Sequence, residues 1–190
     1  ESRRGHGIEW LRAPAAACER GEAWIWDEVR FAFLSPGRGE DWSENNGSCV
    51  LEITNTHGRA LLTGDIEAPL EAHLAALALW RGSDLIVIPH HGSRSSSSAV
   101  LVDSVAPRYA IVSAGARNRW KFPNAEVAER WCHAGAQLLN TADWGAISID
   151  FSARSGIQAP RSYRLEHPHY WSARVPLAGR SRCSSQNDVH

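Results

Sequence analysis

The 190-residue chain contains no methionine, and only one of its 20 cationic residues, Lys121, is a lysine. Because the sequence begins with Glu1 and has no initiating methionine, we expect it to be a piece of a longer protein. The arginine excess fits either a GC-rich coding sequence or a preference for phosphate groups, and composition leaves both open. The net charge of −1 provides no global attraction to nucleic acid or membrane, so any basic surface has to be local.

Long apolar runs and closely spaced cysteines are also absent. No apolar run approaches about 18 residues, so the sequence predicts no membrane-spanning helix, and no secretory signal is visible. The four cysteines include no C-x-x-C pair, which argues against a cysteine-based zinc site. Cys49 lies in an apolar segment, so we expect a small core residue there rather than a ligand. The spacing leaves disulfide formation open.

The hydrophobic pattern predicts a β-rich first part followed by alternating strands and helices. We predict a hairpin over 23–34, strands at 48–54, 60–63, 84–88, 109–113, 137–139 and 146–151, and helices at 68–80, 96–105 and 124–134. This order indicates an α/β domain with a mixed sheet covered by helices on one face. We expect an irregular segment over 1–20, the main unit over 21–152, and a polar, disordered tail over 153–190. Trp24, Trp26, Trp131 and Trp144 are expected to be buried or half-buried.

Two predicted strands end in residues that can bind metal or move protons. Asp65 follows an apolar strand and Gly64, where it could cap the next helix or bridge two metal ions. His90 and His91 end another strand, between Pro89 and Gly92. Neighbouring side chains on a strand point to opposite sides, so we expect at most one of these histidines to face a site. Loops at strand ends of an α/β sheet are common places for catalytic groups.

A serine-rich loop and a basic loop follow these strands. The serines from Ser93 to Ser98 could form a linker, a phosphate-binding loop or a nucleophile, although no Ser–His–Asp order is visible. Four cations and no acid lie between residues 108 and 121, and Trp120 lies among them. Arginine and lysine interleaved with tryptophan suit a phosphodiester backbone and base stacking, whereas a solvated basic loop is the alternative.

Several segments in order resemble one protein family. They are residues 45–51, 62–67, 87–93, 113–115 with Asn118-Arg119, the hairpin around 26–31, and the turn at 144–146. This series is similar to the metallo-β-lactamase-like domain at the C-terminus of the ComEC family of DNA-uptake competence proteins. The resemblance implies part of a metallo-β-lactamase αββα sandwich with mixed sheets. It also implies a place in the bacterial inner membrane for the parent protein, with this segment soluble, on the periplasmic side and without lipid contact of its own.

The resemblance also implies a site and its partners. Asp65 would bridge two divalent ions, zinc or manganese, and His91 would complete the shell of one, with His90 as a catalytic neighbour. The implied activity is hydrolysis of phosphodiesters, as a nuclease-like domain beside the membrane channel and remaining domains of the parent protein. The implied partner is single-stranded DNA, and its contacts are expected at Ser93, Arg94, Asn118, Arg119 and Lys121.

Two departures from the family pattern leave alternatives open. The H-x-H-x-D-H motif that supplies most metal ligands is absent from residues 1–64, and Phe122 stands before Pro123 where the family has histidine. With one aspartate and one or two histidines, a zinc ion lacks a full set of ligands. We therefore expect this chain to be inactive on its own. A metal-free DNA-handling module is the alternative function, and a hydrolase of small esters or lactams is a third.

Overall fold

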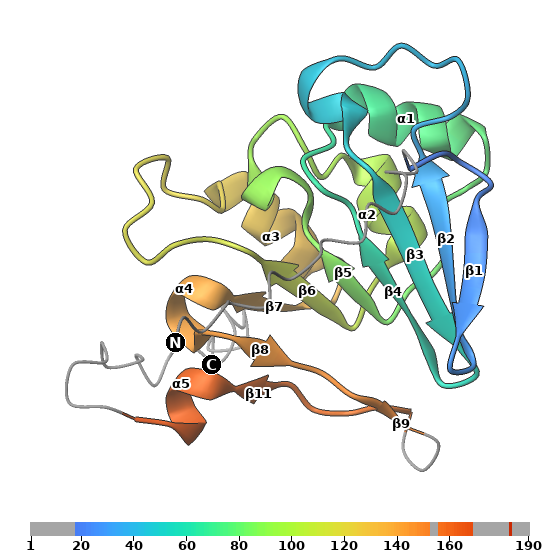
Figure 1. Ribbon diagram of the computed structural model, residues 1–190. Coiled ribbons are helices and arrows are strands. Elements are labelled where there is room, and N and C mark those ends of the chain that lie inside the picture. The colour runs from blue at the N-terminus through green and yellow to red at the C-terminus, as the bar shows by residue number, and fades with distance from the viewer. Residues whose placement is uncertain (1–17, 153–155, 169–182, 184–190) are drawn as a thin grey trace, which may run out of the picture.

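The computed structural model describes residues 18–152, 156–168 and 183 (Figure 1). The strands are β1 (Ala23–Trp26), β2 (Val29–Ser35), β3 (Val50–Asn55), β4 (Gly58–Leu62), β5 (Leu85–Val87), β6 (Tyr109–Val112), β7 (Gln137–Asn140), β8 (Ile147–Ser148), β9 (Phe151–Ser152), β10 (Gly156–Ile157) and β11 (Arg161–Ser162). The α-helices are α1 (Ala68–Ala76), α2 (Ala99–Val105), α3 (Ala125–His133), α4 (Thr141–Trp144) and α5 (Tyr163–Glu166). Among these residues, no helix has both the length and the apolar character needed to cross a membrane.

Seven strands form one mixed sheet in the order β1-β2-β3-β4-β5-β6-β7. The first four are antiparallel neighbours and the last four are parallel ones, so β4 joins the two parts. The tight turn between β1 and β2 has positive φ at Asp27 and Glu28, which matches the twist of a two-residue hairpin. The carboxyl ends of β4, β5 and β6 meet at one edge, where the candidate residues lie.

Helices α1, α2 and α3 cover one face of the sheet (Figure 1). Their apolar side chains pack onto alternate sheet residues such as Leu61, Ile86 and Leu138, and the largest buried side chain is Trp131 on α3. α3 begins at a true N-cap, because the side chain of Asn124 accepts a hydrogen bond from the backbone of Glu126 at 3.0 Å. The predicted helix-covered face is therefore confirmed.

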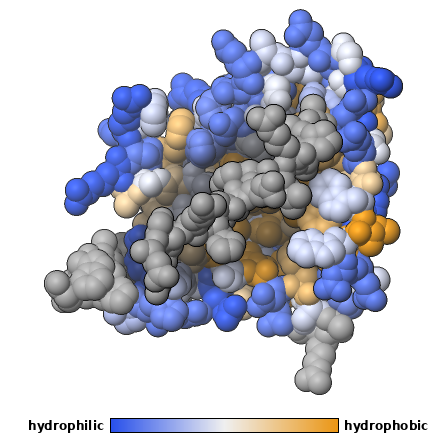
Figure 2. All heavy atoms as spheres, viewed as in Figure 1, coloured by the Kyte–Doolittle hydropathy of each residue, from blue (hydrophilic) through white to orange (hydrophobic). Residues whose placement is uncertain are grey.

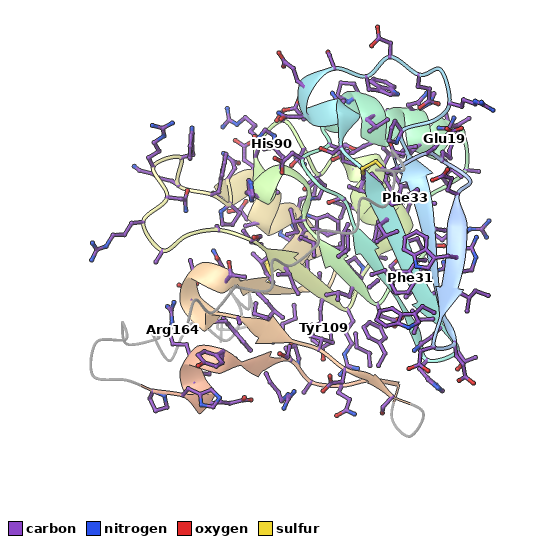
Figure 3. The ribbon with its side chains drawn as sticks, viewed as in Figure 1. Glu19, Phe31, Phe33, His90, Tyr109 and Arg164 are labelled. Atoms are coloured by element: carbon purple, nitrogen blue, oxygen red, sulfur yellow. A yellow bond between two sulfur atoms is a disulfide. The ribbon has the colours of Figure 1, made fainter. Side chains whose placement is uncertain are left out.

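The opposite face of the sheet is covered by the chain after β7. Tyr109 and neighbouring sheet residues pack against Trp144, Ile147 and Phe151, and Tyr109 lies between the sheet and the layer of β8 and β11 (Figures 1 and 3). Two small antiparallel pairs, β9 with β10 and β8 with β11, form this layer. The molecule is thus a mixed α/β structure, with helices on one side of its main sheet and further strands on the other. This arrangement is compatible with an αββα sandwich.

The region expected to be a disordered tail is partly structured. Residues 156–168 form β10, β11 and α5, since Ile157 joins the apolar cluster beneath the sheet and the Ser162 hydroxyl donates to the Trp144 carbonyl at 2.6 Å. Elements of two to four residues are too short to produce a periodic sequence pattern, which explains the wrong prediction. Residues 1–17, 169–182 and 184–190 of the predicted end segments lie outside the described residues.

The β1–β2 hairpin differs from expectation in its exposure. Trp131 and Trp144 are buried as predicted, but Trp24 and Trp26 are 43% and 73% exposed. Trp24 stacks on Phe31 with ring centroids 5.1 Å apart. Figure 2 shows a small exposed orange patch beside pale side chains at the right of the view, where this hairpin lies. The prediction failed because β1 is the edge strand of the sheet, and alternation along a strand does not reveal whether another layer covers it.

Two disulfide bonds join distant segments of the chain. Cys18 bonds to Cys49 and Cys132 bonds to Cys183, closing sequence separations of 31 and 51 residues. The first ties the residues before β1 to the start of β3, and the second ties the end of α3 to residue 183. Cys49 is exposed and oxidised rather than a core residue, which corrects the expectation from its apolar neighbours.

Candidate metal centre and nucleic-acid interface

A cleft of about 400 Å³ opens at the edge where β4, β5 and β6 end. The segment after β4 is tied to the end of β5, because the buried Thr63 hydroxyl donates to the Val87 carbonyl at 2.7 Å. The cleft is lined by Asp65, His90, His91, Ser113, Ala114, Gly115, Asn118, Trp120 and Phe122. The structure therefore brings together all three residues predicted to be catalytic, from two separate strand ends.

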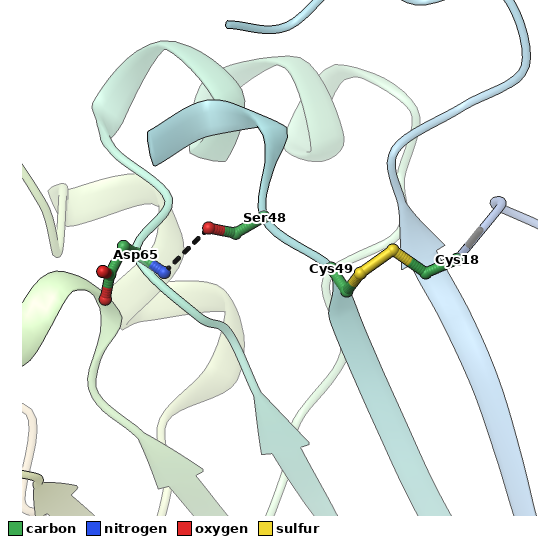
Figure 4. The surroundings of a disulfide bond; sticks show 4 residues. All are labelled: Cys18, Ser48, Cys49 and Asp65. Atoms are coloured by element: carbon green, nitrogen blue, oxygen red, sulfur yellow. Dashed lines mark hydrogen bonds between the residues drawn. A yellow bond between two sulfur atoms is a disulfide. The ribbon is translucent and has the colours of Figure 1, made fainter. Parts of the chain in front are cut away.

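Asp65 is held by its backbone, and its carboxylate is left available. Its amide donates to the Ser48 hydroxyl at 3.1 Å, next to the disulfide at Cys49 (Figure 4). Gly64 precedes it with φ of +57°, and a Cβ on this glycine would lie 2.8 Å from Ser48 Cβ, so only glycine fits. The N-cap of α1 is Glu67, which rules out the helix-capping alternative for Asp65.

His90 and His91 lie on a 3-10 turn, Pro89–Gly92, and not on the strand itself. Both have left-handed backbone angles, with φ of 47° and 55°, and this conformation brings both rings to the cleft. The expectation that only one histidine faces the site is therefore wrong. The turn is fixed by a hydrogen bond from the His90 amide to the Gly64 carbonyl at 3.0 Å, which places the histidines beside Asp65.

The hydrogen bond of His91 decides which ring nitrogen faces the cleft as an acceptor. Nδ1 lies 2.7 Å from the Ser113 carbonyl oxygen, which can only accept, so Nδ1 carries the hydrogen. In the neutral imidazole, Nε2 then holds a free lone pair, and it lies 3.6 Å from Asp65 Oδ1. Both side chains are 45% exposed, so the pair is open to a ligand.

Glu67 holds His90 in place and was not among the predicted site residues. Its Oε1 accepts from the Ser95 hydroxyl at 2.6 Å and from His90 Nδ1 at 3.1 Å. The Ser95 bond is the main cause that holds the pKa of Glu67 below its ordinary value, against the opposing effect of burial. The Glu67 amide also donates to Asn46 Oδ1 at 2.9 Å, so residues 45–48 brace the segment that carries Asp65. The sequence signal that could have identified Glu67 as a site residue is its position two residues after Asp65.

Aromatic rings lead from His91 outward to solvent. Phe122 lies nearly parallel to the His91 ring at 6.2 Å between centroids, and Trp120 stacks on Phe122 at 6.1 Å. Trp120 is 62% exposed, and the Arg119 guanidinium lies 4.1 Å from the centre of its ring. Phe122, where the resemblance implies a histidine, is thus part of a continuous stack.

The predicted DNA-contacting residues are not gathered at one place. Arg119 and the exposed Lys121 flank Trp120, near the cleft. The Asn118 amide braces its own loop, accepting from the Phe122 amide at 2.6 Å and donating to the Phe122 carbonyl at 3.2 Å. Arg94 forms an ion pair with Glu126 at 2.8 Å, and neither Arg94 nor Ser93 lines the cleft.

Asp65 and His91 fit a metal ion as part of a ligand shell. For metal–ligand bonds of about 2.0–2.1 Å, two donors of a tetrahedral ion lie about 3.3 Å apart, close to the 3.6 Å seen here. Within the described ranges, no group of three or more His, Cys, Asp or Glu side chains is placed to hold an ion. Two donors are fewer than the three that a catalytic zinc site takes from protein, so these two side chains alone do not make up such a site.

Comparison with known proteins identifies the family, although no family model matches the chain. It is 36% identical over 143 residues to Competence protein ComA of Neisseria gonorrhoeae and 37% identical over 134 residues to Recombination protein 2 of Haemophilus influenzae. The chain belongs to the ComEC family of competence proteins. It is also 37% identical over 152 residues to YcaI of Escherichia coli K12. These matches cover 70–76% of the chain but only 17–20% of each relative.

Proposed function

We propose that this ComEC-family chain is one half of a metal-dependent phosphodiesterase domain that acts on DNA during natural transformation. The observation that carries the proposal is the convergence of Asp65 Oδ1 and His91 Nε2, 3.6 Å apart, in an open cleft beside stacked aromatic rings. The relatives named for competence and recombination support DNA as the substrate class.

In this proposal, Asp65 and His91 would hold a zinc or manganese ion together with donors from polypeptide outside the described residues. Such an ion lowers the pKa of a bound water and stabilises negative charge on a phosphodiester. The chain's own residues orient these two donors: Ser113 fixes the His91 tautomer and Ser48 fixes the Asp65 backbone. The Glu67 carboxylate, at His90 Nδ1, keeps the neighbouring ring against the cleft.

A metal-free DNA-handling module is the second candidate. The observation that favours it is Phe122, a side chain that can neither bind metal nor move a proton, at the centre of the ring stack. In this alternative the cleft guides a strand without cutting it. The alternative keeps the DNA contacts of the first proposal and removes the metal, so measurements of metal binding separate the two.

The exposed Trp120 ring provides a surface on which a DNA base can stack. Base–aromatic stacking contributes about 1–3 kcal/mol per base, so we expect Trp120→Ala to weaken binding of a thymidine oligonucleotide by about fivefold or more. Fluorescence anisotropy with a labelled strand measures the change. Trp26→Ala, which removes another exposed tryptophan from the distant hairpin, is the matched control and should bind like the unaltered chain. Equal losses in both variants would show that the Trp120 ring has no specific role.

The two disulfides support a proposal about location. Disulfides form and persist in oxidising compartments and are rare in the bacterial cytosol. The described chain contains two, and one of them lies directly beside the segment that positions Asp65 (Figure 4). We therefore propose that this segment resides on the periplasmic side of the inner membrane when it is part of its parent protein.

A further inference from the structure

A second cleft of about 400 Å³ lies apart from the one at Asp65 and His91. Four arginines line it: Arg20, Arg30, Arg59 and Arg81. The acid among its described lining residues is Glu52. In a chain whose net charge is −1, this arginine cleft is a local concentration of positive charge that the composition does not reveal.

The strand register builds the floor of the arginine cleft. Arg30 on β2 pairs with Thr54 on β3, and Thr54 pairs with Arg59 on β4, so the three form one row across the sheet. Arg59 and Leu61 are two residues apart on β4, so their side chains point to the same face of the sheet. Because Leu61 packs against the helices, the row of Arg30, Thr54 and Arg59 lies on the helix-covered face. Arg59 Nη1 donates to the Gly82 carbonyl at 3.2 Å, which brings the segment after α1, with the exposed Arg81, to the same place.

Neighbouring acids neutralise only part of this charge. Arg20 pairs with Glu40, and the Glu52 carboxylate is shared by Arg30 at 3.7 Å and Arg59 at 3.4 Å. Four guanidinium groups against these two carboxylates leave an excess of two positive charges. Arg81 makes no ion pair with any described residue.

The guanidinium groups are also short of hydrogen-bond acceptors. Arg20 Nη1 is buried without a hydrogen-bond partner in the described part of the chain, and the buried Arg59 Nε lies 3.4 Å from Glu52 Oε2 without forming a hydrogen bond. A buried donor without a partner costs about 1–3 kcal/mol, so such groups normally mark a place where something else supplies the acceptor. A phosphate group supplies several oxygen acceptors and negative charge together, and arginine binds it in a planar, bidentate manner.

We infer that the arginine cleft binds the phosphodiester backbone of a DNA strand, as a contact point separate from the Asp65–His91 cleft. Arg59 lies at the start of β4 and Asp65 lies just beyond its end, about 20 Å away for six residues of extended chain. A single DNA strand can therefore span the distance between the two clefts. The choice of DNA rests on the proposed function, whereas the charge and the missing acceptors do not depend on any metal.

The test is the salt dependence of oligonucleotide binding by the Arg30→Ala, Arg81→Ala double variant. Each phosphate contact to a single strand contributes about 0.7 to the slope of log affinity against log salt, so the slope should fall by about 1.4. Arg38→Ala, Arg161→Ala is the matched control, because these two arginines are well exposed and line neither cleft, and its slope should stay unchanged. Anisotropy is measured in EDTA, so the result is independent of metal binding.

Each outcome separates this inference from the proposed function. An unchanged slope in the double variant overturns the inference that the arginine cleft binds DNA, and it leaves the Asp65–His91 proposal intact. If the double variant has a reduced slope and Trp120→Ala binds as tightly as the unaltered chain, the DNA contact at the arginine cleft is supported and the proposed stacking contact at Trp120 is wrong. If phosphatidylglycerol vesicles bind more tightly than the oligonucleotide and lose binding in the double variant, the ligand is a lipid headgroup and the inference is wrong. Arg81→Ala alone, at an exposed position, serves if the double variant does not fold.

Discussion

Reduction of the two disulfides is expected to lower the free energy of unfolding by about 4 kcal/mol for each bond. The reason is the entropy of the unfolded chain, which rises when loops with sequence separations of 31 and 51 residues are opened. Since domains of this size are stable by only about 5–15 kcal/mol, loss of both bonds should bring the chain close to unfolding at ordinary temperature. Urea unfolding with and without a reductant measures the effect.

Paired serine variants separate the two bonds. Cys132→Ser with Cys183→Ser removes only the bond at the end of α3, and Cys18→Ser with Cys49→Ser removes only the bond beside Ser48. The second pair should also loosen the segment that positions Asp65, because Ser48 accepts its amide hydrogen bond. If thiol titration of the unfolded, unreduced chain finds four free cysteines, the disulfides and the proposed periplasmic location are both wrong.

Glu71→Ala is expected to destabilise the chain by about 3 kcal/mol. The Glu71 carboxyl group is buried and accepts from the backbone amides of Ser97 and Ser98, each at 2.6 Å. These amides begin the turn into α2, whose N-cap Ser98 makes no side-chain cap bond, so a carboxylate from α1 caps this helix instead. Alanine leaves the buried Ser97 amide and the half-buried Ser98 amide unpaired, and it removes the charge that faces Arg130.

The pH dependence of stability identifies the role of Glu71. Burial raises its pKa in the folded chain above the ordinary value of 4.5. Between the unfolded and folded pKa values the folded state therefore binds more protons, so the contribution of Glu71 to stability falls as pH rises through that window. Glu71→Gln should remove this fall while costing less than alanine near neutral pH. Parallel stability curves for Glu71→Gln and the unaltered chain would show that Glu71 does not titrate in this window.

Strand and helix positions follow from the sequence where the hydrophobic pattern is long or has strong punctuation. The hairpin at 23–34, the helix beginning at Ala68 and the cap at Asn124 were all predictable, because alternation, proline and asparagine have fixed geometric meanings. The predicted helix at 96–105 began three residues too early. The residues predicted as its first turn are not helical, and the backbone amides of Ser97 and Ser98 donate to Glu71 instead. The contact between Ser97 and Glu71 joins residues 26 positions apart in the sequence.

The candidate site was predictable in its residue types and only partly in its geometry. Asp65, His90 and His91 meet because parallel strands place their carboxyl ends at one edge, a rule that the sequence order already contains. The shared orientation of the two histidines depends on left-handed backbone angles at both, which no strand pattern indicates. The arginine cleft was missed for a related reason. Arg30, Arg59 and Arg81 are scattered along the chain. The strand register brings Arg30 and Arg59 together, and the hydrogen bond from Arg59 to the Gly82 carbonyl adds the segment with Arg81.

The most direct test of the central claim is zinc uptake at equilibrium, measured by dialysis and elemental analysis. The unaltered chain should bind one more zinc ion per chain at saturation than Asp65→Ala or His91→Ala. His73→Ala, which changes a histidine on α1 outside the cleft, should bind like the unaltered chain. Equal zinc content in all four proteins would contradict the account, because Asp65 and His91 would then hold no metal in this chain.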